Sequence, residues 1–215
     1  MISGALLGRG DIEDLLSELG RRCAARGLNA EMFLVGGAAM ALAYSRDRVT
    51  RDLDAVFEPK TAVYEEARSV AIDRGLPEDW LNDAVKGLLP DGPDRGEQAA
   101  FVRPGIAVAV ASPEYLFAMK ALSARAEGDS GDLRILAGIL GVTSPEEAFR
   151  IVERQYRPER LTAKASLFIQ SVFGGTDWEA ARPSTPDGEV FVAAHTRNGR
   201  SVEAHTRRRP APIAR

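Results

Sequence analysis

The stretch that decides the fold is GGAAMALAYSRDRVTRDLDAVF, residues 36–57. Two glycines end a short apolar run, an apolar helix-like stretch follows, and R-x-T-x-D-x-D then enters a second apolar run. This order predicts a strand, a backbone turn, a helix and a second strand that carries two acidic residues. The chemistry of the stretch depends on those acids and on the glycine pair.

Asp52 and Asp54 are two residues apart at the second strand. Because side chains alternate faces along a strand, residues i and i+2 point the same way, roughly 6–7 Å apart. Two such carboxylates repel each other unless a cation lies between them, and Mg²⁺ binds oxygen ligands of this kind together with substrate phosphates. Gly36 and Gly37 let the backbone approach a phosphate chain and offer N–H donors. The stretch therefore predicts a phosphate-and-metal site.

Each part of this pattern is common by itself. A D-x-D pair is usually solvated or caps a helix, and a glycine pair after an apolar run is usually only a turn. The joint order of strand, glycine pair, helix and acid pair is much rarer by chance. The joint order therefore favours a functional site.

The block resembles the catalytic signature of the DNA polymerase β-like nucleotidyltransferase superfamily, in which a glycine-rich turn, a helix and D-x-D on the next strand follow one another. The R-x-T-x-D-L-D of residues 48–54 is similar to the toxin branch of that superfamily, as in the AbiEii and MenT toxins. The similarity continues in DWLND (residues 79–83), in SPEYLFAMK (residues 112–120) and in D-x-x-D-L (residues 129–133). The resemblance covers about residues 30–140.

The resemblance implies transfer of NMP from an NTP to an acceptor hydroxyl, with Mg²⁺ or Mn²⁺ as the cofactor. It implies that Asp52 and Asp54 hold the metal ion and that Lys120 reaches the triphosphate. It also implies that Asp129 or Asp132 completes the catalytic set as a base or a metal-linked carboxylate. The alternatives are an ordinary surface lysine and a helix cap formed by either aspartate.

The residues expected to contact the nucleotide are Gly36, Gly37, Arg48, Arg51 and Lys120. The two arginines flank the acids, so they either bind phosphate or pair with the acids. Two features depart from the superfamily pattern. The strand predicted at residues 106–111 (IAVAVA) lacks the third carboxylate that often lies there, and Gly37 stands where serine is commoner.

The likeness to the toxin branch implies that the acceptor is a tRNA 3′ end and that the partner is a separately encoded antitoxin. Two alternatives remain open. The same chemistry can act on a small molecule, as in the aminoglycoside nucleotidyltransferases, or the fold can serve as a non-catalytic binding module.

The composition is that of a soluble globular protein, with 45% apolar and 27% charged residues in 215. No apolar run approaches the roughly 18 residues that span a bilayer, and the N-terminus lacks the features of a secretory signal. We therefore expect a cytoplasmic protein with no membrane partner. Cys23 is the only cysteine, which excludes a disulfide framework.

Charge is unevenly distributed along the chain. Residues 182–215 carry seven arginines and three acidic residues, a net +4, so the remainder carries −7 of the overall −3. An acidic body with a basic tail is compatible with local contacts to phosphate and is not typical of a protein that coats nucleic acid. Asn198-Gly199 in the tail predicts a hairpin, across which His195 and His205 would face each other without a metal role.

The predicted fold class is α+β: a polymerase β-like mixed sheet with helices, then a C-terminal helical bundle and a basic tail. The predicted domains are an α/β core (1–112), a helical domain (113–178) and a Pro/Arg-rich tail (179–215). The predicted helices span residues 12–26, between an Asp11 cap and a Gly27 stop, then 38–44, 61–74, 113–127, 129–140, 145–154 and 159–173. The predicted strands span residues 32–35, 53–57 and 106–111.

Overall fold

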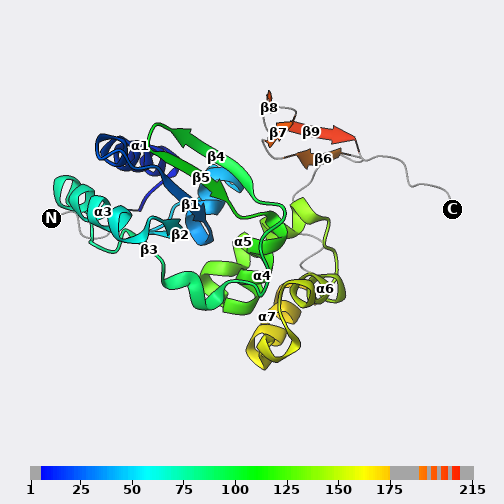
Figure 1. The fold of residues 1–215 in the computed structure, drawn as a ribbon. Coiled ribbons are helices and arrows are strands. Elements are labelled where there is room, and N and C mark those ends of the chain that lie inside the picture. The colour runs from blue at the N-terminus through cyan, green and yellow to red at the C-terminus, as the bar shows by residue number, and fades with distance from the viewer. Residues whose placement is uncertain (1–5, 175–188, 193–194, 198–199, 203–204, 209–215) are drawn as a thin grey trace.

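The computed structural model describes residues 6–174 and, in the tail, residues 189–192, 195–197, 200–202 and 205–208. Its centre is a five-stranded mixed sheet in the order β3-β2-β1-β5-β4 (Figure 1). The strands are β1 (Ala30–Leu34), β2 (Leu53–Glu58), β3 (Leu81–Asn82), β4 (Gln98–Arg103) and β5 (Ile106–Val110). β1 pairs antiparallel with β2 and parallel with β5, while β2 pairs parallel with β3 and β4 antiparallel with β5. The predicted α+β class is confirmed.

Helices cover one face of this sheet and extend beyond its end (Figure 1). α1 (Arg9–Ala25) and α3 (Lys60–Arg74) pack on the face that carries the buried residues of β2 and β5. α2 (Gly36–Ala39) leads directly into the π-helical segment η1 (Met40–Tyr44). The 3₁₀ turn η2 (Ala84–Leu88) lies between β3 and β4. Beyond β5 come α4 (Pro113–Ser123), α5 (Ala126–Leu140), α6 (Pro145–Gln155), the 3₁₀ turn η3 (Pro158–Arg160) and α7 (Ala163–Phe173).

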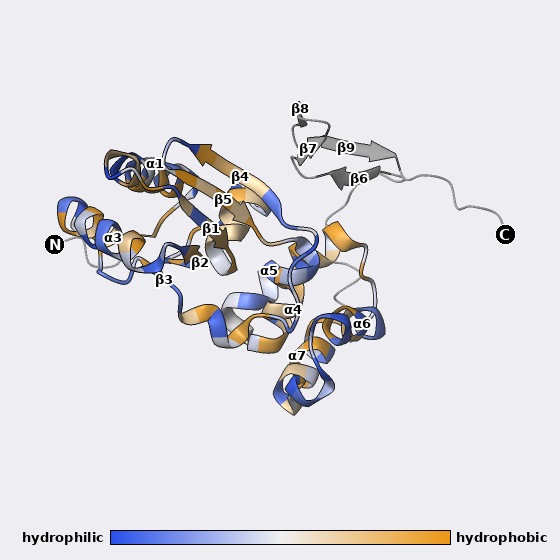
Figure 2. Ribbon diagram, viewed as in Figure 1, coloured by the Kyte–Doolittle hydropathy of each residue, from blue (hydrophilic) through white to orange (hydrophobic). Residues whose placement is uncertain are grey.

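The sequence explains the first helix well. The residues predicted to repeat at helical spacing, from Ile12 to Cys23, are buried against the sheet, and Figure 2 shows apolar residues along the strands that they cover. The predicted cap is wrong by one turn: Gly8 is the N-cap, and Asp11 lies inside the helix and accepts the backbone N–H of Gly8. Burial raises the pKa of the Cys23 thiol, which fits a packing role.

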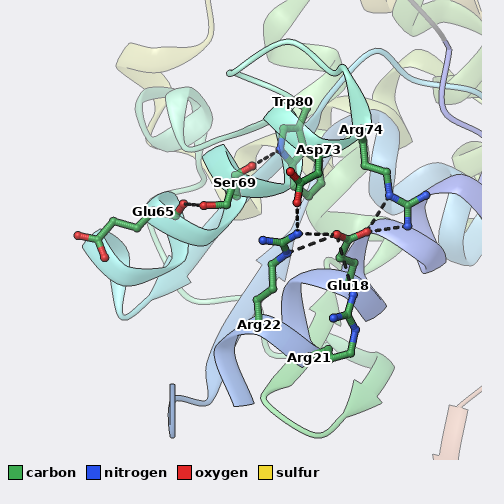
Figure 3. Close-up of polar contacts among 9 residues, drawn as sticks. Glu18, Arg21, Arg22, Glu65, Ser69, Asp73, Arg74 and Trp80 are labelled. Carbon is green, nitrogen blue, oxygen red and sulfur yellow. Dashed lines mark hydrogen bonds and ion pairs between the residues drawn. The ribbon is translucent and has the colours of Figure 1, made fainter. Parts of the chain in front are cut away.

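A buried carboxylate joins α1 to α3 (Figure 3). Glu18 is 8% exposed, and its two oxygens contact Arg22 of α1 at 2.9 Å and Arg74 of α3 at 2.6 Å. Arg22 also pairs with Asp73 of α3. The hydrogen bond from Arg22 is the main cause that keeps the pKa of Glu18 below its usual range. These contacts fix the two helices that support the sheet.

The break between the two helices after β5 lies earlier than predicted. Ser112 caps α4 by accepting the backbone N–H of Tyr115, as the Ser-Pro pair suggests, but α4 ends at Ser123 because Ala124 adopts a left-handed backbone, with φ of 49°. α5 then begins at Ala126, so Asp129 lies inside its first turns. Because α5 begins earlier than predicted, both Asp129 and Asp132 lie within this helix.

Other differences concern short or irregular elements. β3 and β4 are not predicted, because β3 has two residues and β4 lacks clear alternation. The helix predicted over residues 159–173 is instead a separate turn at residues 158–160 followed by α7, which Thr162 caps. The helix predicted over residues 38–44 is divided between α2 and η1.

The described part of the tail forms two antiparallel strand pairs. β6 (Glu189–Val192) pairs with β9 (His205–Arg208), and β7 (His195–Arg197) pairs with β8 (Arg200–Val202). The predicted pairing across Asn198-Gly199 is present, although those two residues lie outside the described ones. The expectation that His195 faces His205 is wrong, because His195 lies opposite Val202 and His205 lies opposite Val192. The predicted three-domain division stays a prediction. No described helix is both long and apolar enough to cross a membrane.

Candidate functional site

A cleft of about 390 Å³ lies where the sheet meets α4 and α5. Seven of the nine predicted site residues line it: Gly36, Gly37, Arg48, Asp52, Asp54, Lys120 and Asp129. Asp132 lies beside the cleft, where it contacts two of those side chains. Arg51 is exposed and does not line the cleft. Most of the residues predicted separately are thus brought together.

The glycine turn fits tightly against the acid-bearing segment. Gly36 has a positive φ of 62°, and a Cβ there would lie 2.8 Å from Oδ2 of Asp54. A Cβ at Gly37 would lie 2.6 Å from Oγ1 of Thr50. Both positions therefore require glycine for steric reasons. The Thr50 hydroxyl occupies the space that a serine side chain at position 37 would need.

Asp52 and Asp54 are held at the start of β2. The strand begins at Leu53, so Asp52 precedes it, and both half-buried carboxylates line the cleft. Burial is the main cause that raises the pKa of Asp54 above its usual range, and the neighbouring Asp52 raises it further. Among the described residues, no Lys, Arg or His pairs with either carboxylate within 4.0 Å.

This electrostatic arrangement fits a divalent cation. Two carboxylates that repel each other inside a cleft gain most from a small, hard cation between them. The described residues contain no group of three or more His, Cys, Asp or Glu that could hold a metal ion. A cation bound by Asp52 and Asp54 would therefore need further oxygen ligands from substrate or water, as is usual for Mg²⁺.

A buried ammonium group lies on another wall of the cleft. Lys120 of α4 is 6% exposed, and its Nζ lies 2.7 Å from Oδ2 of Asp132 and 3.1 Å from Oδ1 of Asp129. Asp132 also contacts Nε of Arg48 at 3.0 Å. Lys120 is thus not an ordinary surface lysine, and the two aspartates engage cationic side chains in this structure.

Asp129 acts in part as a helix cap, which was one of the alternatives for the two aspartates. Oδ2 of Asp129 accepts the backbone N–H of Arg125 at 3.3 Å and the hydroxyl of Ser123. Both interactions hold the start of α5, while Oδ1 of the same carboxylate faces Lys120. Within the described part of the chain, Asp132 makes no such contact with the backbone. Asp129 thus links the start of α5 to the ammonium group of Lys120.

Sequence reasoning missed several polar residues of the cleft, namely Thr50, Asn82, Ser123 and Arg125. Asn82 is the residue of β3 paired with Asp54, and its Nδ2 lies 3.2 Å from Oδ2 of Asp52. The DWLND stretch belongs to the sequence resemblance, but no periodic pattern identifies a two-residue strand. The apolar β5, by contrast, is separated from the acid-bearing β2 by β1.

Comparisons with known proteins add little. No family model matches the chain, and no curated protein matches it. Among solved structures, the chain is similar to an antigenic nucleotidyltransferase-like protein from Paracoccidioides brasiliensis, with 16% identity over 80% of this chain and 100% of that chain and a TM-score of 0.36. At this level of similarity the comparison leaves the family of the chain open.

Proposed function

We propose that this chain is a Mg²⁺-dependent nucleotidyltransferase that transfers NMP from an NTP to an acceptor hydroxyl. The observation that supports this most is one cleft with three parts. It combines the carboxylates of Asp52 and Asp54, which make no ion pair with any described residue, a glycine turn packed against them, and the buried Lys120. An anion that carries its own divalent cation complements all three parts.

Each part has a distinct role in the proposed reaction. A metal ion held by Asp52 and Asp54 would polarise the α-phosphate and lower the pKa of the attacking hydroxyl. Gly36 and Gly37 let the backbone turn pack closely against Asp54 and Thr50, and the N–H groups of that turn would face the phosphates. Lys120 has three ammonium protons, of which the two aspartates accept two, so one remains for a phosphate oxygen.

The acceptor that we propose is a tRNA 3′ end, and the setting is a toxin that a separately encoded antitoxin controls. The support is the likeness of residues 48–54, 112–120 and 129–133 to the toxin branch of the polymerase β-like nucleotidyltransferases. The net +4 of residues 182–215 is compatible with contacts to an RNA backbone.

A second candidate acceptor is a cationic small molecule. Glu31, Glu58 and Glu97 line a groove of about 460 Å³ that lies against the sheet. Glu31 and Glu58 are exposed and directly opposite each other on β1 and β2, where like charges are unfavourable unless a cation lies nearby. An aminated acceptor would relieve that repulsion.

One experiment tests the reaction and its acceptor. The full chain is incubated with Mg²⁺, each labelled NTP and either total tRNA or aminoglycosides, beside the variants Asp54→Asn and Asp47→Asn. Asp47 is an exposed aspartate close by in the sequence, so its variant removes the same charge outside the cleft. We expect label on tRNA with the wild type and Asp47→Asn and none with Asp54→Asn.

Other outcomes discriminate among the alternatives. Label on aminoglycosides alone would favour the small-molecule acceptor. No transfer to any acceptor, together with NTP binding that Asp54→Asn leaves unchanged, would favour a non-catalytic binding module. Truncation at about residue 180 tests the tail, since loss of a phosphate contact lowers both RNA affinity and its salt dependence.

A further inference from the structure

We infer that Asn82 is a positioning residue that orients Asp52 for the cation and limits the centre to two carboxylates. This inference rests on the proposed function, since it concerns the same metal site. Asn82 lies on β3, beside Asp54 in the parallel register of the sheet, and lines the cleft. It is the side chain next to the acid pair on the neighbouring strand.

The hydrogen bonds determine which way the amide points. Oδ1 of Asn82 accepts the backbone N–H of Ala84 at 3.1 Å, and a backbone donor needs an acceptor there. The NH₂ group must therefore point the other way, where it lies 3.2 Å from Oδ2 of Asp52. The amide thus offers the acid pair a donor and keeps its oxygen turned away.

The next residue anchors this amide. Both Lys60 of α3 and Lys86 of η2 lie within 2.7 Å of Oδ2 of Asp83, and the hydroxyl of Tyr64 donates to Oδ1 at 2.7 Å. These contacts, led by the one with Lys60, hold the pKa of Asp83 well below its usual range. Asp83 therefore ties the backbone next to Asn82 to both α3 and η2.

The chemical consequence concerns charge as well as orientation. Because the amide oxygen is turned toward the backbone of Ala84 and the NH₂ group toward Asp52, Asn82 offers no ligand and no charge to the cation site. Its donor restrains one oxygen of Asp52 and leaves the other lone pairs of the carboxylates for the cation. A carboxylate at the same place would make a three-acid centre, which binds divalent cations more tightly without nucleotide.

Binding of Mn²⁺ to the full chain without nucleotide tests this inference, with free Mn²⁺ measured by electron paramagnetic resonance. We expect Asn82→Ala to weaken binding about tenfold, in line with the loss of other groups that orient metal ligands. We expect Asn82→Asp to strengthen it by a similar factor. Asn29→Asp is the matched control, since Asn29 is exposed and lies before β1, and it should bind as the wild type does.

The opposite changes in Mn²⁺ affinity expected for Asn82→Ala and Asn82→Asp distinguish a positioning role of Asn82 from a purely structural one. If both Asn82 variants weaken Mn²⁺ binding, or if both bind as the wild type does, the inference is overturned while the proposed function stands. If the Asp54→Asn variant binds Mn²⁺ as tightly as the wild type does, both the inference and the proposed metal site are overturned. Thermal unfolding of each variant confirms that the chain remains folded, and Asn82→Asp provides the decisive sign if Asn82→Ala unfolds.

Discussion

Nζ of Lys120 lies 2.7 Å from Oδ2 of Asp132, and both side chains are almost completely buried. A charge pair at this depth contributes little net stability, because desolvation offsets the attraction, but loss of one partner is costly. The pair therefore holds an ammonium group at a fixed place in the cleft.

Lys120→Met should lower the free energy of unfolding by about 3 kcal/mol, since among the described residues it leaves Arg48 as the remaining ion-pair partner of the buried Asp132 and leaves Asp129 without one. Adding Asp129→Asn to Lys120→Met should restore part of that loss, because one uncompensated charge disappears. Urea denaturation measures both effects. Lys164→Met on the exposed side of α7 is the control and should change stability little. Equal stability of Lys120→Met and the wild type would contradict the charge network.

Asp54→Asn should stabilise the fold while it abolishes NMP transfer. The pKa of Asp54 is raised by its burial and by Asp52, so the ionised carboxylate is held in an unfavourable place. We expect a gain of the order of 1 kcal/mol at pH 7 in the absence of metal, the usual trade-off at an active site. Added Mg²⁺ should stabilise the wild type and not the variant, as thermal unfolding can measure. A less stable variant would argue against charge repulsion at this site.

The fit between Gly37 and Thr50 predicts a compensating pair. Gly37→Ser should destabilise the chain, because its Cβ would meet the Thr50 hydroxyl at 2.6 Å. Thr50→Ala removes that hydroxyl, so the double variant should recover stability relative to Gly37→Ser alone. A double-mutant cycle from chemical denaturation gives the coupling energy, expected at about 1 kcal/mol or more. Additive effects would mean that the turn moves aside instead.

Stability should fall in acid partly through Glu18. The pKa of this carboxylate is lowered in the folded state, first by the hydrogen bond from Arg22, so its contribution is complete above its unfolded pKa near 4.5. It is lost as the pH falls through the lower folded value. Glu18→Gln should therefore cost about 2 kcal/mol at pH 7 and progressively less in acid. Unfolding curves between pH 7 and pH 3 measure the difference, and a cost that does not depend on pH would exclude this cause.

Local patterns predicted much of the fold and the centre of the site. The glycine pair, the acid pair and the stripe from Ile12 to Cys23 depend on neighbours within a few residues, so sequence spacing was enough. The helix boundary at Ala124 was missed because nothing in the sequence requires an alanine with positive φ. That error also placed Asp129 at a helix start instead of inside α5.

The rest of the site depends on contacts between distant segments. Arg48 and Asp132 are 84 positions apart and meet only because α5 packs beside η1, which precedes Arg48. Asn82 reaches the acids only because a two-residue strand adds to the edge of β2. Such relationships come from the three-dimensional arrangement and leave no periodic signal in the sequence.

The isolation of Cys23 gives the chain a built-in reporter of folding. Its thiol is the only one in the sequence, and it is completely covered between α1 and the sheet. A thiol reagent can therefore react with the native chain only when α1 opens, so the labelling rate reports that opening. Cysteines introduced on the rim of the cleft would react first and selectively. The protein thus suits distance measurements by paired labels without prior removal of its own cysteine.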